Sequence, residues 1–114
     1  AAVSAGDRAY HYICDWAVQN ANKLCGHSDT LEVLGAMEPG RAYIVRSVFD
    51  RVVSDAGFST AATLSYLKSN GLIETRGRNY TRGKRINGQL TECISLKLEE
   101  IDDDVDDTDH ELPL

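Results

Sequence analysis

Apolar residues recur at steps of three and four between residues 7 and 25, a spacing that predicts an amphipathic helix. The apolar stripe of this helix consists of Tyr10, Ile13, Cys14, Ala17, Val18, Ala21 and Leu24. Asp7 is the expected N-cap, because its side chain can accept from the first free amides, and Gly26 is the expected stop.

Tyr12 and Trp16 stand four residues apart on the same helix but well away from its apolar stripe. A second aromatic face on one helix is expected to be buried by another part of the protein, and there are two candidates for that part. One is the domain's own loops, and the other is a further region of a longer polypeptide. We expect such a region because the chain starts at Ala1 without an initiator Met.

Two short β-prone runs follow, Leu31–Met37 and Ala42–Val45, and the Pro39-Gly40 pair between them predicts a hairpin. Apolar spacing then predicts a helix over 46–56, stopped by Gly57. A second helix follows directly, with Ser59 as N-cap and Ser69-Asn70-Gly71 at its end.

The rest of the folded part is predicted to be β-structure. Leu72–Thr75 is one strand, Asn79–Ile86 a second and Gln89–Leu98 a third. Asn87-Gly88 separates the last two and favours a two-residue hairpin turn. From Glu99 onward acidic residues dominate, and this composition predicts a disordered tail over 99–114 after a domain at 1–98.

The charge is divided in the same way. Residues 1–98 hold twelve basic and nine acidic side chains, a formal charge of +3, whereas residues 99–114 hold nine acidic side chains and no Lys or Arg. The average net charge of −6 therefore does not exclude a polyanionic partner for the folded part.

Five basic residues fall within ten positions of the β-region. Together with the aromatic Tyr80 among them, they form a candidate nucleic-acid-binding wing: Arg76, Arg78, Arg82, Lys84 and Arg85. Basic side chains would contact phosphates, and Tyr80 would stack on a base or sugar. The alternative is a charged strand edge that discourages aggregation.

A polar stripe on the second helix of the pair is a further candidate for DNA contact. It consists of Ser59, Thr63, Tyr66 and Asn70, and it carries no Arg, so specific recognition of guanine is not expected. A plain solvent-facing surface is the alternative interpretation.

The order of these elements, with Leu64-x-x-Leu67-x-x-x-Gly71-Leu72-Ile73 at the junction of helix and wing, resembles a winged helix. A more specific resemblance to one protein family involves four segments, Asp15–Asn20, Glu32–Gly35, Ala42–Ile44 and Lys84–Gly88. They are similar to the C-terminal segment of a domain-of-unknown-function family of phage, plasmid and mobile-element proteins, which resemble P-loop replicative helicases or primase-helicases. The resemblance implies an accessory domain beside an upstream ATPase region.

Catalytic chemistry is not indicated. No P-loop occurs, and Cys14 and Cys25 would stand about 16 Å apart on a helix, too far to share one metal ion. We therefore expect no enzyme, no cofactor and no bound metal. No membrane segment is expected, and the three cysteines suit a reduced, cytoplasmic protein.

The tail leaves three interpretations open: a solubilising end, a competitor for the basic wing, or a peptide that recruits another protein. The third depends on Leu112, Pro113 and Leu114, which follow acidic residues and resemble the tip of bacterial single-stranded DNA-binding proteins. That tip normally ends in Phe, whereas this sequence ends in Leu.

We thus expect an α+β fold, a winged helix with an additional N-terminal helix and a short β-hairpin. Its expected role is non-specific DNA contact in a phage or mobile-element replication protein. The alternative role is docking of a protein partner through Tyr12 and Trp16, without direct DNA contact.

Overall fold

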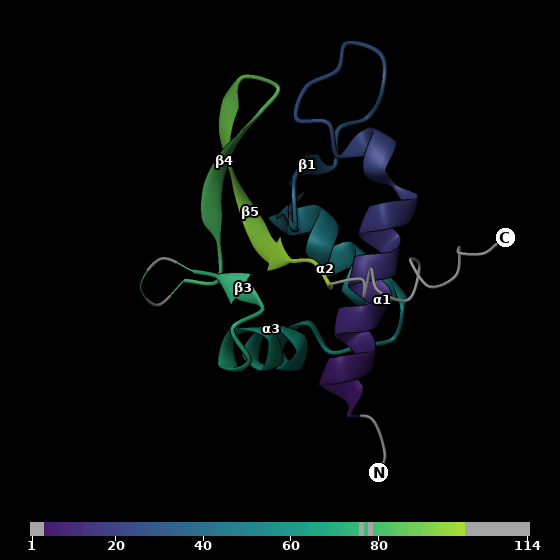
Figure 1. Ribbon diagram of the computed structural model, residues 1–114, viewed down its shortest axis with the longest axis vertical. Helices are drawn as coiled ribbons and strands as arrows, with labels where there is room; N and C mark the ends of the chain where they lie inside the picture. Colours follow the sequence, from purple (N-terminus) through teal and green to yellow (C-terminus); the bar gives the residue numbers. More distant parts are fainter. Residues whose placement is uncertain (1–3, 76, 78, 100–114) are drawn as a thin grey trace, which may run out of the picture.

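The computed structural model describes residues 4–75, 77 and 79–99 (Figure 1). Along the chain its elements are α1 (Ala5–Gln19), the 3-10 helix η1 (Ala21–Lys23), β1 (Gly35–Glu38), β2 (Arg41–Val45), α2 (Arg46–Asp55), α3 (Thr60–Ser69), β3 (Ile73–Glu74), β4 (Arg82–Ile86) and β5 (Gln89–Lys97). The α+β class and the winged-helix order are confirmed. Of the tail predicted over 99–114, residues 100–114 lie outside the described residues.

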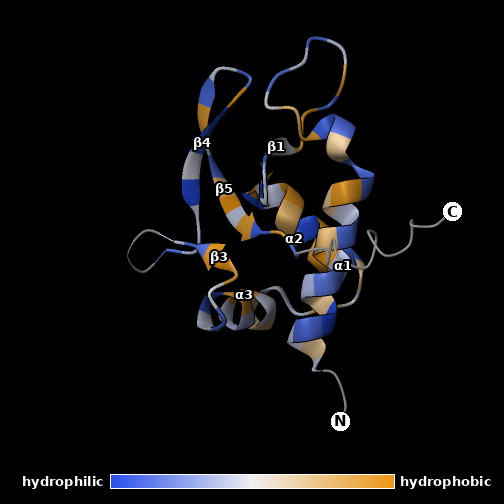
Figure 2. Cartoon of the chain, in the orientation of Figure 1, coloured by the Kyte–Doolittle hydropathy of each residue, from blue (hydrophilic) through white to orange (hydrophobic). Residues whose placement is uncertain are grey.

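All strand pairs are antiparallel, and the strand order in the sheet is β1-β2-β5-β3. β4 pairs with the first part of β5, on the same edge of β5 that pairs with β3 further along. The three helices cover one face of this sheet, and apolar residues line the contact (Figures 1 and 2). Ile44, Ile94 and Leu96 are fully buried there. Ile13, Phe49 and Leu67, one from each helix, meet them in the same core.

The first helix is shorter than predicted. It is capped by Ser4, whose Oγ accepts from the amide of Asp7 at 3.1 Å, and it ends at Gln19 instead of reaching Gly26. The side chain of Asn20 donates to the carbonyl of Trp16 at 2.9 Å, in the last turn of the helix. Gly26 instead donates to the carbonyl of Gly35 at 2.9 Å, beside β1.

The strands also begin later than predicted, β1 at Gly35 and β4 at Arg82. The backbone of β2 lies very close to Gly35, since an added Cβ would stand 1.9 Å from the carbonyl oxygen of Tyr43. The predicted Asn87-Gly88 turn is confirmed, because both residues have positive φ, 53° and 81°, as a type I′ turn requires.

The second face of the sheet has a small apolar cluster of its own, formed by Ala36, Ile86 and Cys93. Ser95 is fully buried on this face, and Arg41 Nη1 donates both to its carbonyl, at 3.0 Å, and to its Oγ, at 2.9 Å. Burial also raises the pKa of the Cys93 thiol to about 11, so this sulfur stays protonated near neutral pH. Both groups therefore serve the sheet structurally.

Candidate nucleic-acid interface

Two helices joined by a tight turn, α2 and α3, form the centre of the candidate interface. Gly57 adopts a left-handed φ of +89° in the turn, and the amide of Phe58 donates to the carbonyl of Val53 at 3.1 Å. Ser59 caps α3 as predicted, because its Oγ accepts from the amide of Ala62 at 3.2 Å. This geometry is that of a helix-turn-helix unit.

The predicted polar stripe of α3 faces solvent only at its two ends, Ser59 and Asn70. Thr63 is only 3% exposed, and the Tyr66 ring packs against Gly6 of α1 while its hydroxyl donates to Asp7 Oδ1 at 3.2 Å. Ser59 and Asn70 serve as helix caps, with Asn70 Nδ2 donating to the carbonyl of Tyr66 at 2.8 Å. The correction follows from α1, which packs on this side of α3.

The free side of α3 is instead the one that bears Ala61, Ser65, Lys68 and Ser69, all exposed. Lys68 Nζ lies 5.4 Å from the ring centroid of Tyr80, in the segment between β3 and β4. We call these five residues the α3 surface. Lys68 was not in the predicted stripe because that stripe followed the polar residues, two of which face α1.

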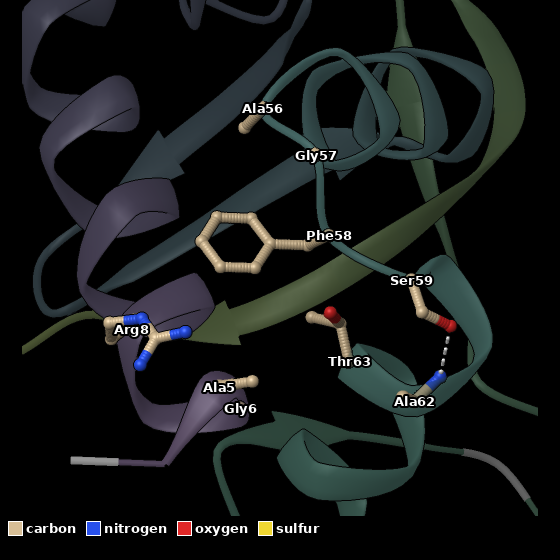
Figure 3. Close-up of a pocket in the computed structure, with 9 residues that line it drawn as sticks. All are labelled: Ala5, Gly6, Arg8, Ala56, Gly57, Phe58, Ser59, Ala62 and Thr63. Carbon is tan, nitrogen blue, oxygen red and sulfur yellow. Dashed lines mark hydrogen bonds between the residues drawn. The ribbon is translucent and has the colours of Figure 1, made fainter. Parts of the chain in front are cut away.

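A hollow of about 420 Å³ opens between the start of α1 and the turn before α3 (Figure 3). The guanidinium of Arg8 and the ring of Phe58 both extend into the hollow, and Ser59 and Thr63 line its other side. A cationic side chain is thus placed close to the first turn of α3, where the helix dipole is also positive.

The basic wing predicted from sequence is not one surface. Arg82 Nη1 lies 2.6 Å from Glu74 Oε2, and Lys84 Nζ lies 2.5 Å from Glu38 Oε2. Lys84 also lies 4.6 Å from the ring centroid of Tyr43, and its hydrogen bond to Glu38 raises its pKa. These two cations are therefore largely engaged within the sheet.

The other members of the predicted wing are divided. Arg85 Nη1 donates to the carbonyl of Gly88 at 3.1 Å, near the tip of the β4–β5 hairpin. This tip lies at the far end of the molecule from α3 (Figure 1), where the amide of Asn87 donates to the carbonyl of Gly26 at 2.8 Å. Arg76 and Arg78 lie outside the described residues.

Formal charge is concentrated in the part of the chain that carries α3. Residues 56–85 hold six basic side chains and one acidic side chain, a formal charge of +5. Residues 1–55 hold five basic and seven acidic side chains, a formal charge of −2. Since α3 itself has no Asp or Glu, an approaching polyanion meets no carboxylate on that helix.

The predicted aromatic face on α1 is present, though less open than expected. Tyr12 is 45% exposed and its ring centroid lies 6.1 Å from that of Phe58, while Trp16 is half-buried against the core. Hollows of about 310 and 210 Å³ adjoin Trp16. Leu112, Pro113 and Leu114 lie outside the described residues.

Other chemistry finds little support in the described part of the chain. Within residues 4–75, 77 and 79–99, no group of three or more His, Cys, Asp or Glu side chains could hold a metal ion. No helix in the same residues is long and apolar enough to cross a membrane.

Comparison with known proteins agrees with this geometry. A family model described as the Cch helix turn helix domain matches residues 4–101, a range that includes every helix and strand. The match confirms the predicted helix-turn-helix domain and does not address an ATPase in the same polypeptide. No curated protein and no solved structure matches the chain.

Proposed function

We propose that this chain, which belongs to the Cch helix-turn-helix domain family, binds DNA through the α3 surface and the β3–β4 segment beside it. The observation that carries the proposal is the free side of α3, which has no carboxylate and bears Lys68 beside the ring of Tyr80. A DNA backbone brought against this side loses counterions and gains phosphate contacts.

Each group on this surface suits a particular contact. Ala61 and Ser65 are small, so they allow a groove wall or a backbone to come close to the helix axis. Lys68 reaches a phosphate, and Tyr80, already beside the Lys68 ammonium, offers an aromatic face on which a base or sugar stacks. Because α3 carries no Arg, contacts to phosphate dominate and binding is largely independent of sequence.

We also propose that the domain is an accessory module of a phage or mobile-element replication ATPase. The support for this context is the resemblance of segments such as Glu32–Gly35 and Lys84–Gly88 to such proteins. In this arrangement the helix-turn-helix domain holds DNA near a motor that lies elsewhere in the polypeptide.

A salt titration tests the DNA-binding proposal. We expect the full chain to bind a labelled duplex at low salt. The logarithm of its association constant should fall steeply as the logarithm of the salt concentration rises. Lys68→Ala should reduce the magnitude of the slope by about one, the value for one lost phosphate contact. Lys84→Ala is the matched control and should leave the slope nearly unchanged, because Glu38 already pairs with this ammonium.

The outcomes of this titration separate the alternatives. Absence of binding at low salt, or an equal change of slope in both variants, would reject the α3 surface as the DNA site. Measurement by fluorescence anisotropy at four or more salt concentrations gives the slope directly.

A second candidate function is protein docking through Tyr12 and Trp16. The observation in its favour is the exposure of Tyr12 together with the hollows that adjoin Trp16. The hollow of about 310 Å³ is lined by charges of both signs, Lys23 and Arg51 against Glu32 and Asp55, a pattern typical of the rim of a protein interface. Under this alternative, Lys68→Ala has no effect on partner binding.

A further inference from the structure

The acidic residues at the end of the chain begin beside α1, the helix that packs against α3. The chain leaves the sheet at Lys97, whose carbonyl accepts from the Tyr10 hydroxyl at 2.7 Å, and Glu99 forms an ion pair with His11 Nδ1. Both partners are on α1. The acidic segment, which we define as residues 100–111, therefore begins from a fixed point on the domain.

This fixed point is near the contact between α1 and α3. His11 lies four residues along α1 from Asp7, which accepts from Tyr66 of α3, and four residues of helix span about 6 Å. The twelve residues from 100 to 111 extend at most about 40–43 Å. An α-helix with its side chains is about 10–12 Å across, so the acidic segment is long enough to pass around α3 from the side that faces α1 to the α3 surface.

We propose that the acidic segment competes with DNA for the α3 surface of the same chain. It carries eight carboxylates and no Lys or Arg, so it presents the same sign of charge as a DNA strand to a surface that bears Lys68 and no carboxylate. This inference rests on the proposed DNA-binding function, which it extends to the regulation of the same surface.

The charge distribution favours the α3 surface over the Trp16 face as the site of this contact. The hollows beside Trp16 are lined by Asp15, Glu32 and Asp55 as well as by Lys23 and Arg51, so an acidic segment meets three repulsive and two attractive partners there. On α3 it meets Lys68 and no carboxylate.

The expected size of the effect follows from tethering. A short linker gives an effective concentration on the order of 1 mM. A contact with a dissociation constant of about 0.1 mM would then occupy the surface most of the time and weaken DNA binding about tenfold. Salt screens the contact, so the effect shrinks as ionic strength rises.

The test uses the full chain with its acidic segment neutralised but not shortened. The variant carries Glu100→Gln, Asp102→Asn, Asp103→Asn, Asp104→Asn, Asp106→Asn, Asp107→Asn, Asp109→Asn and Glu111→Gln. We expect it to bind duplex DNA about tenfold more tightly than the unchanged chain at low salt, with the difference lost near 1 M salt. A second variant, with residues 100–114 in reversed order, keeps the charge and should bind as the unchanged chain does.

Amide NMR spectra without DNA distinguish direct competition from a general effect of net charge. Competition requires that neutralisation shift the signals of Ser65 and Lys68 more than those of Asp15 and Gln19. The proposed competition would be rejected if the neutralised and unchanged chains bound DNA with equal affinity, or if signals shifted only on the Trp16 face. Either result would leave the proposed DNA binding unaffected. Failure of every variant to bind DNA at low salt would instead reject the proposed function.

Discussion

Ser65→Glu should lower the affinity for duplex DNA by about tenfold or more at low salt. Ser65 is exposed at the middle of the free side of α3, one turn before Lys68. A carboxylate there faces DNA phosphates and also pairs with Lys68, so it adds repulsion and removes an attraction. A tenfold loss corresponds to about 1.4 kcal/mol, a usual size for one unfavourable charge at an interface.

Gln19→Glu is the matched control for this substitution. It makes the same change in net charge at an exposed position of α1, outside the α3 surface. Glu has a good helix propensity, so neither variant should lose helical structure, and circular dichroism checks this. The α3 surface would be rejected if both variants bound DNA equally well in anisotropy titrations.

Gly35→Ala should destabilise the domain by about 3 kcal/mol or more. The added Cβ would lie 1.9 Å from the carbonyl oxygen of Tyr43 and 3.1 Å from the Cα of Ile44, both backbone atoms of β2. Backbone atoms in a paired strand cannot move aside as a side chain can, so the β1–β2 pair must separate. A loss of this size belongs to the severe end of single substitutions.

Urea denaturation followed by the fluorescence of Trp16, the single tryptophan, measures this loss. Gly83→Ala provides the comparison, because the nearest atom to its Cβ is Leu90 Cδ1 at 3.1 Å, on a side chain that is 73% exposed. We expect it to change the free energy of unfolding by less than about 1 kcal/mol. Similar losses in both variants would show that the close approach at Gly35 is not a special constraint.

Local signals in the sequence predicted local structure well. Ser59 as a cap, Gly57 as a stop and Asn87-Gly88 as a turn were all identified correctly, because each depends on the conformational preference of one or two residues. Asp7 and Gly26 were wrong as the ends of the first helix. There Ser4 and Asn20 offer competing hydrogen bonds, and the sequence pattern alone does not rank such competitors.

The candidate site was less predictable because it depends on tertiary contacts. Thr63 and Tyr66 are polar, so their spacing indicated a solvent-facing stripe, yet the absence of a side chain at Gly6 lets the Tyr66 ring lie against α1. The basic residues of β4 are neighbours in sequence but meet different partners, Glu74 for Arg82 and Glu38 for Lys84. The partner of each basic residue depends on the face of the strand that it occupies and on carboxylates that are distant in the sequence. A run of basic residues predicts neither of these.

The anchoring of the β4–β5 hairpin has a consequence for local unfolding. Its tip is fastened by Asn87, whose amide donates to Gly26 and whose Oδ1 accepts from the amide of Ser28 at 3.1 Å. The ribbon is thus held at the tip as well as through its pairing in the sheet. Opening of this tip must therefore break both of these hydrogen bonds as well as the β4–β5 pairing, so the amide protons of the tip should exchange with solvent more slowly than those of a free hairpin end.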